Sequence, residues 1–185
     1  VSKPYVFRTY LAAERDPAAQ EKAAALTILA ALLGGDAQTS HLARALQFDT
    51  QTAVYTAAFY DGTSIDDGTF GLVVVPAPDV SLEDAEKALD AALAKFLADG
   101  PDPAAFERIK TQIRASEIYA KDDVHGLAYK YGEALTIGLS LDDIRAWPDV
   151  LAAVTLDDVK AAAAEVLRKE NSVTGWLKQP QEAAQ

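Results

Sequence analysis

The chain has no cysteine and no methionine, and it has only two histidines among its 185 residues. The lack of cysteine excludes disulfides, thiolate zinc sites and thiol nucleophiles, and it leaves the cellular compartment open. His41 and His125 lie far apart, and neither stands in an H-x-x-E-H or H-x-x-x-H pattern, so no zinc-peptidase helix is expected here. Because translation begins with methionine, we expect a domain cut from a longer protein, which leaves open whether a signal peptide has been lost upstream.

Positive charge is also scarce, since the chain has 17 Lys and Arg but 28 Asp and Glu, which gives a formal net charge of −11. A nucleic-acid site needs a basic surface, so we expect no nucleic-acid partner. We expect no membrane partner either, because anionic lipid attracts basic segments and no apolar run is long enough to span a bilayer. Half of the residues are hydrophobic. A single domain is expected over residues 1–178, followed by a frayed polar tail at 179–185.

Hydrophobic periodicity predicts strands at both ends of the chain and one pair of strands between them. The strands are expected at Tyr5–Ala12, 52–59, 69–75 and Ser172–Leu177, where β-branched and aromatic residues gather. The middle two read as an antiparallel pair joined by a loop of about nine residues. Helices are expected from Asp16-Pro17 onward and over 39–47, 81–98, 103–119 and 155–168. This order predicts an α+β domain whose mainly antiparallel sheet carries its helices on one face.

The many carboxylates have a structural explanation at the helix starts. Ser81, Ser140 and Thr155 each precede two acidic residues, a pattern in which the hydroxyl caps the helix and the acids suit its positive end. Asp122-Asp123-x-His125 offers three metal-ligating side chains, but we interpret it as a solvated helix boundary. No G-x-S-x-G elbow, phosphate loop or dinucleotide fingerprint is present. Taken alone, the residues show no catalytic apparatus.

The most informative stretch is a turn between two helices, Leu33-Gly34-Gly35-Asp36-Ala37-Gln38-Thr39-Ser40-His41-Leu42, followed by Ala45-Leu46. The glycines offer the backbone freedom of a helix C-cap, and Thr39 or Ser40 can cap the next helix. The stretch resembles the L-G-G-G-x-x-S-R-L-Y-x-x-L segment of insulinase-like (pitrilysin-type) zinc metallopeptidases, where it lies in the second, zinc-less domain. Asp36 stands where a third glycine is usual, and His41 where an arginine is usual.

The other features of the chain are similar to bacterial members of this family in the same order, from about residue 5 to 178. The matching segments are Ala98-Asp99-Gly100, Ala105-Phe106-Glu107-Arg108-Ile109-Lys110, Tyr131-Gly132-Glu133-Ala134-Leu135, Trp147-Pro148, Val154-Thr155-Leu156-Asp157-Asp158-Val159 and Ser172-Val173-Thr174-Gly175. The resemblance implies one half of a clamshell that encloses a peptide substrate. It also implies that zinc and its general base belong to a missing N-terminal catalytic domain or partner subunit, so this chain alone is expected to be inactive and free of cofactor.

The resemblance also implies a substrate-binding role for Gly34, Gly35, Gln47 and Tyr55. Many family members hold the substrate with an arginine after the glycine turn and a tyrosine on the next strand. Here Gln47 stands at the arginine position, and Tyr55 stands at the tyrosine position. A strand aromatic packed in the sheet is the other interpretation of Tyr55. In the non-catalytic subunit of mitochondrial processing peptidase, a longer glycine-rich loop at the turn is implicated in substrate handling, and the short turn here favours a structural corner.

Three functions stay open at this point. The chain is the zinc-less half of a peptidase, part of an inactive subunit that binds substrate or acts as a scaffold for a catalytic partner, or an unrelated interaction module. The sequence upstream discriminates between the first two, since an intact H-x-x-E-H there favours a peptidase. The compartment, bacterial cell envelope or cytoplasm, stays open as well.

Overall fold

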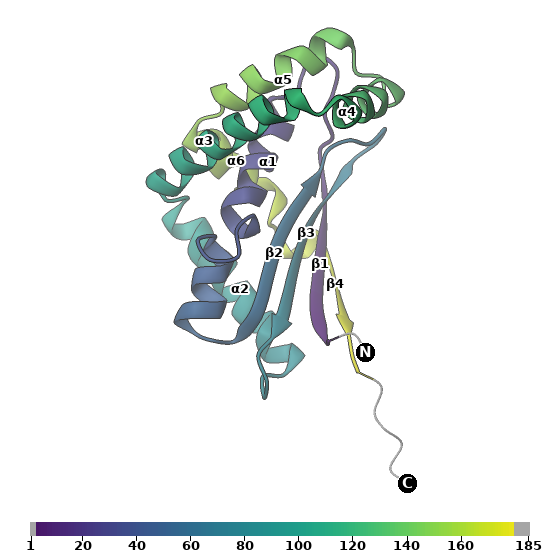
Figure 1. The fold of residues 1–185 in the computed structure, drawn as a ribbon. Helices are drawn as coiled ribbons and strands as arrows, with labels where there is room; N and C mark the ends of the chain where they lie inside the picture. Colours follow the sequence, from purple (N-terminus) through teal and green to yellow (C-terminus); the bar gives the residue numbers. More distant parts are fainter. Residues whose placement is uncertain (1–2, 180–185) are drawn as a thin grey trace.

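The computed structural model of the protein describes residues 3–179. It contains a four-stranded antiparallel sheet with the strand order β2-β3-β1-β4. The strands are β1 (Tyr5–Ala12), β2 (Ala53–Asp61), β3 (Gly68–Pro76) and β4 (Ser172–Leu177). Figure 1 shows the helices gathered on one side of this sheet, which confirms the predicted α+β class. Apart from Gln179, the predicted tail lies outside the described residues.

The helical layer is built from six α-helices with short helical turns between them. They are α1 (Glu21–Gly34), α2 (Leu82–Asp99), α3 (Pro103–Tyr119), α4 (Val124–Thr136), α5 (Leu141–Ala153) and α6 (Leu156–Val166), with the π-helix η1 (Ala43–Asp49) and the 3-10 turns η2 (Ala120–Asp122) and η3 (Lys169–Asn171). Ser81, Ser140 and Thr155 each accept a backbone N–H three residues ahead. The three predicted hydroxyl caps are thereby confirmed.

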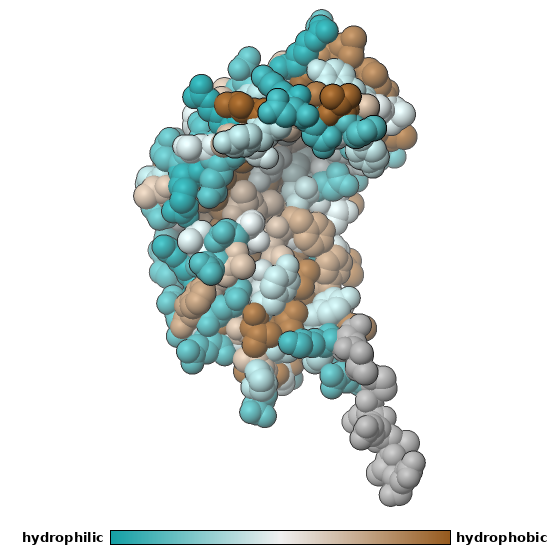
Figure 2. Space-filling model, in the orientation of Figure 1, coloured by the Kyte–Doolittle hydropathy of each residue, from teal (hydrophilic) through white to brown (hydrophobic). Residues whose placement is uncertain are grey.

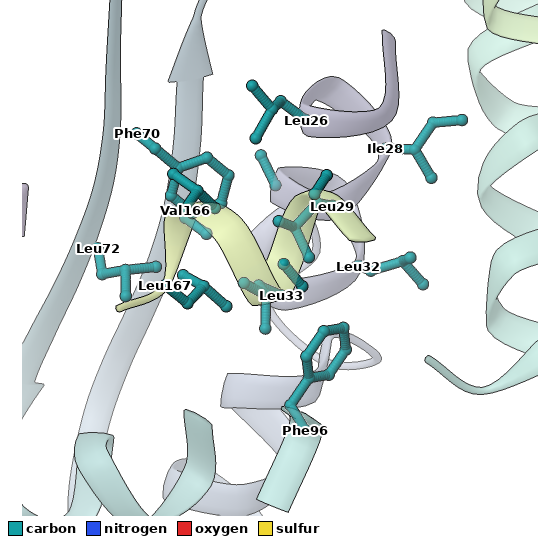
Figure 3. Packing of buried hydrophobic residues seen from close by; sticks show 14 of the residues in the cluster. Leu26, Ile28, Leu29, Leu32, Leu33, Phe70, Leu72, Phe96, Val166 and Leu167 are labelled. Atoms are coloured by element: carbon teal, nitrogen blue, oxygen red, sulfur yellow. The ribbon is translucent and has the colours of Figure 1, made fainter. Parts of the chain in front are cut away.

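Helix α1 lies at the centre of the molecule, between the sheet and the outer helices. It contacts β2 and β3 on one side and α3, α5 and α6 on the other, so apolar residues are buried around its whole circumference. Figure 3 shows Leu29 and Leu33 of α1 in one cluster with Phe70 and Leu72 of β3, with Val166 and Leu167 between them. A helix that is apolar all round is stable in water only when it is covered on every side.

The start of α1 differs from the sequence-based expectation of a helix that begins at Asp16-Pro17. The helix begins at Glu21, because the preceding residues form a turn that is fixed by tertiary contacts. Ala18 has a left-handed φ of 60°, and its N–H donates to Asp143 at 2.8 Å. The Gln20 amide donates to the backbone oxygen of Asp143 at 3.0 Å. These bonds to α5 replace the local helix cap.

The loop between β2 and β3 and the role of the glycine turn also differ from expectation. The two strands extend further than predicted, so only residues 62–67 connect them. Gly35, the C-cap of α1, has an ordinary φ of −73°, so the turn does not exploit the left-handed freedom of glycine. Instead, Gly34 is needed for close packing, because a Cβ there would overlap the backbone of Ala57 and Ala58 in β2.

A buried arginine connects the centre of the sheet to α2. Arg8 of β1 is 1% exposed, and its guanidinium donates to Glu86 at 2.8 Å and to Asp90 at 2.5 Å. Arg8 Nε also donates to the Thr174 hydroxyl of β4 at 2.8 Å. Burial by itself would raise the pKa of Asp90, but the hydrogen bonds from Lys169 and Arg8 lower it overall, so the carboxylate stays charged.

Substituting Gly34→Ala is expected to destabilise the chain by about 1–3 kcal/mol, because the added methyl group must push α1 away from β2. Gly132→Ala in α4 is the matched control, since a Cβ there meets no neighbour within 4 Å. The control is expected to be neutral or to stabilise the chain by up to about 1 kcal/mol. Urea denaturation of both variants measures the difference, and equal midpoints would contradict the close packing at Gly34.

Substituting Arg8→Met is expected to cost about 3 kcal/mol of unfolding free energy, because Glu86 loses its cation in a partly buried site and Asp90 keeps only the exposed Lys169. The exposed pair Lys22–Glu165, 2.5 Å apart, gives a control. Lys22→Met is expected to cost less than about 1 kcal/mol. Urea denaturation at neutral pH compares the two variants. A loss for Arg8→Met no larger than that for Lys22→Met would show that the buried cluster contributes no special stability.

Candidate functional site

The face of the sheet opposite the helices is open, and we call it the open face. Within residues 3–179, it consists of the strand side chains that alternate with the buried, helix-facing ones. These side chains are neighbours across the paired strands. They are Tyr5, Phe7, Thr9 and Leu11 of β1, Tyr55, Ala57 and Phe59 of β2, Thr69, Gly71, Val73 and Val75 of β3, and Val173, Gly175 and Leu177 of β4. None of these side chains is charged. Asp61, at the end of β2, is the first carboxylate on this side.

Aromatic side chains form the middle of the open face. Phe7 and Phe59 stack with ring centroids 5.9 Å apart. The ring of Phe59 lies directly over Gly71, where a Cβ would overlap it. Tyr55 and Phe59 are 49% and 40% exposed, although large apolar groups usually turn inward. Figure 2 shows hydrophobic residues over β2 and β3, with the surface hollowed between them and the helices at the top.

The structure gathers three of the four residues predicted for the site around one short stretch of β2. Gln47, in η1, donates its amide to the Thr56 hydroxyl at 2.8 Å, and Thr56 is 2% exposed on the helix side. Gly34 packs behind Ala57 and Ala58. A β-bulge lies between Ala53 and Tyr55, and Tyr55 points to the open face. Gln47 and Tyr55 therefore lie on opposite sides of β2.

The fourth residue, Gly35, is exposed in the turn after α1. Neither Thr39 nor Ser40 forms the helix cap that we expected, and the helix after the turn has no side-chain cap; Asp36 instead stabilises the turn itself. Its carboxylate accepts the backbone N–H of Gln38 at 2.9 Å and both the N–H and the hydroxyl of Thr39. The same hydrogen bonds, from Gln38 first, lower the pKa of Asp36. The Ser40 hydroxyl is buried and has no hydrogen-bond partner in the part of the chain that the structure describes.

The histidines and carboxylates do not form a metal centre. His41 Nε2 lies 3.0 Å from the backbone oxygen of Ala92, and its ring meets the Phe96 ring edge-on. His125 is exposed, and the neighbouring Asp123 accepts the Gly126 N–H as a helix cap. Within residues 3–179, no three His, Asp or Glu side chains gather closely enough to hold a metal ion. This donor set does not fit zinc.

The sequence-based reasoning missed most of the open face. It singled out Tyr55 but not its neighbours Phe7, Phe59 and Gly71. Alternation of exposed and buried residues in Tyr5–Ala12 marks one side of β1. The register that places Gly71 opposite Phe59 is visible only in the folded sheet.

In the described range, none of the helices combines the length and the apolar character that a bilayer crossing requires.

Comparison with known proteins identifies relatives of this fold. The sequence profile described as "Peptidase M16 inactive domain" matches residues 6–113. No curated protein sequence is significantly similar to the chain.

Among solved structures, a protease from Helicobacter pylori superposes with a TM-score of 0.85 at 20% identity, covering 97% of this chain and 42% of that one. The inactive peptidase domain of a candidate zinc protease from Bordetella parapertussis gives 0.83 at 20% identity, covering 96% and 93%. A peptidase M16 inactive domain from Pseudomonas fluorescens gives 0.73 at 19% identity, covering 94% and 40%. The chain thus spans less than half of the Helicobacter and Pseudomonas proteins. By its sequence profile and its fold, this chain belongs to the peptidase M16 inactive-domain family.

Proposed function

We propose that the chain is the non-metal-binding half of a zinc endopeptidase and that its open face forms one wall of a peptide chamber. The observation that carries this proposal is the uncharged, partly aromatic open face, which no described helix covers. An exposed apolar surface of this kind is more typical of an interaction site than of ordinary solvent-exposed protein surface. A wall without charges suits an unfolded peptide, whose backbone and apolar side chains offer no fixed charge pattern.

On this proposal zinc and the general base are supplied by an N-terminal domain or a partner subunit. Two observations support the division. The described residues hold no metal-binding cluster, and the chain spans only 42% of the Helicobacter pylori protease that it resembles. Residues 1–178 would then act as a single domain that closes against the zinc-bearing half. Zinc in that half would supply an activated water for hydrolysis, while this chain binds and orients the peptide and excludes bulk water.

The four residues singled out in the sequence have two different roles in this proposal. Tyr55 contacts the peptide directly, because its ring is exposed on the open face. Gln47, Gly34 and Gly35 act from the helix side of the sheet. Gln47 holds the buried Thr56 hydroxyl, and the glycine turn lets α1 lie close to Ala57 and Ala58. Together they fix the position of β2 and thus of the Tyr55 ring.

A second function, the substrate-binding or scaffold domain of an inactive subunit, is favoured by one observation. Gln47 stands where the family usually has an arginine, and its amide is already engaged with Thr56 on the helix side. A charged donor to the substrate is therefore missing from this position. The catalytic partner would then supply that donor as well as the metal. Both functions share the open face as the peptide-contacting surface.

The isolated chain is expected to bind no stoichiometric zinc and to cleave no peptide, because its described residues offer no ligand cluster. Elemental analysis after dialysis and a fluorogenic peptide assay measure the two properties. One zinc per chain that survives dialysis, together with peptide cleavage, would contradict the division of roles.

Tyr55→Ala is expected to weaken binding of an unfolded apolar peptide about tenfold, because a tyrosine at the centre of an interface contributes strongly to affinity. Leu97→Ala is the matched control, since Leu97 is 43% exposed on α2, away from the open face. Fluorescence anisotropy of a labelled peptide measures both affinities. If the two variants weaken binding equally, Tyr55 is not part of the peptide site.

A further inference from the structure

The outer edge of β4 is a second surface feature, distinct from the open face, and we call it the β4 edge. β4 is the last strand in the sheet order and pairs with β1 alone. Figure 1 shows β4 at the side of the sheet away from β2, and no strand of residues 3–179 pairs with its outer side. The backbone N–H and C=O groups along this edge are therefore open to pairing with another strand.

The β4 edge lacks the features that usually protect an edge strand. Natural proteins block such edges with charged residues, prolines or bulges. β2, at the opposite edge of the sheet, has a bulge between Ala53 and Tyr55 and ends at Asp61. The six residues of β4 include no charge and no proline, and their register with β1 is unbroken. Val173 is 73% exposed, so this regular, uncharged strand can accept a neighbour.

The sequence of β4 is complementary to itself in one antiparallel register, the one that sets Thr174 opposite Thr174 of a second copy. In this register Val173 of one copy faces Gly175 of the other on the open face. On the helix side Trp176, whose indole is bonded to α2, faces Ser172. Each large side chain thus meets a small one. Every residue also keeps the face that it has in the single chain, because a slip by one residue would exchange the two faces.

The charges at the two ends of β4 match in the same register. Lys178, one residue past the strand, lies level with Glu170 of the second copy, two residues before its strand. Neither side chain has an oppositely charged partner within 4.0 Å in the described part of the chain. A two-fold axis makes this contact twice. Moving the axis from Thr174 to Val173 would instead set Lys178 opposite Arg168, a repulsive pair.

We propose that the β4 edge binds a second copy of this chain, with the two β4 strands antiparallel around a two-fold axis at Thr174. Two four-stranded sheets then join into one, and their open faces become a single continuous surface. Backbone hydrogen bonds and the contacts of Val173 and Trp176 stabilise the pair. Because one strand pair buries little surface, the dissociation constant is expected to be about 10–100 μM. The inference does not rest on the proposed function, since it requires neither zinc nor a peptide.

Sedimentation equilibrium of the 185-residue chain measures the self-association directly. Between about 5 and 500 μM the average mass is expected to rise from that of one chain toward that of two. A chain that stays monomeric over this range would overturn the proposal. If it stays monomeric while an unfolded peptide shifts the β4 amides in NMR spectra, the edge binds a peptide and the assignment to a second copy is wrong.

A lysine variant tests whether the dimer uses the β4 edge. Val173→Lys is expected to weaken the dimer about tenfold, because the two lysines are diagonal neighbours across the axis and repel each other. Leu11→Lys is the matched control, since Leu11 is 74% exposed on the same face but lies beyond the residues of β1 that pair with β4. Its dimer is expected to be unchanged. Equal weakening by both variants, or none by Val173→Lys, would place the interface elsewhere and overturn the proposal.

Introduced cysteines test the register, because the chain has none of its own. Facing residues of antiparallel strands have Cα atoms about 4.5–5.5 Å apart, a separation that a disulfide spans. A mixture of Val173→Cys and Gly175→Cys is therefore expected to form a mixed disulfide about tenfold faster than either variant forms a disulfide with itself. Leu11→Cys, on the same face, is expected not to cross-link. Equal rates for all of these samples would indicate random collision and contradict the proposal.

A charge exchange gives an independent measure of the register. Lys178→Glu is expected to weaken the dimer about tenfold, because the contact with Glu170 is lost at both ends and becomes repulsive. Adding Glu170→Lys to the same chain reverses both charges and is expected to restore the affinity. A double variant that dimerises as weakly as the single variant would show that the two side chains do not meet, and would overturn the register.

Discussion

The burial of α1 against the sheet is the constraint on which the rest of the structure depends. This helix is apolar around its whole circumference, so it must be covered by strands on one side and by α3, α5 and α6 on the other. Gly34 brings its last turn into contact with the backbone of β2. Because the helices all lie on one side of the sheet, with α3, α5 and α6 against α1, the opposite side of the sheet is left uncovered and forms the open face.

The hydrogen bonds of Arg8 hold the same sheet in a fixed position against the helices. Arg8 contacts Glu86 and Asp90 of α2 and Thr174 of β4, so the central and edge strands are both held to the helical layer. Trp176 of β4 adds a further bond, since its indole N–H donates to Glu86 at 2.9 Å. Charged groups carry these contacts on the helix side, while the open side of the sheet has a carboxylate only at its end, at Asp61.

Much of this fold could be predicted from the sequence because its signals are local. The strands Tyr5–Ala12 and Ser172–Leu177 show the expected composition, and the caps at Ser140 and Thr155 mark helix starts directly. The start of α1 could not be predicted, because Asp143, remote in the sequence, holds Ala18 in its turn. The glycine pair was recognised as a family marker, but its physical role is close packing.

The candidate site was less predictable, because strand register and tertiary contacts bring its residues together. Tyr55 and Gln47 could be chosen through the family resemblance, but their placement on opposite sides of β2 depends on the tertiary contact between Gln47 and Thr56. The Phe7–Phe59 stack over Gly71 depends on the pairing of three strands. Properties that arise from register and tertiary contact leave no local pattern in the sequence.

The central claim, that the open face lines a peptide chamber, is tested most directly by cross-linking from a single introduced cysteine. The chain has no cysteine of its own, so Tyr55→Cys and Leu97→Cys each carry one photoreactive label at a known place. With the zinc-bearing half and an unfolded peptide present, the label on the Tyr55→Cys variant is expected to capture the peptide, and the label on the Leu97→Cys variant is not. Peptide capture from the Leu97 position alone, or equally from both positions, would contradict the account.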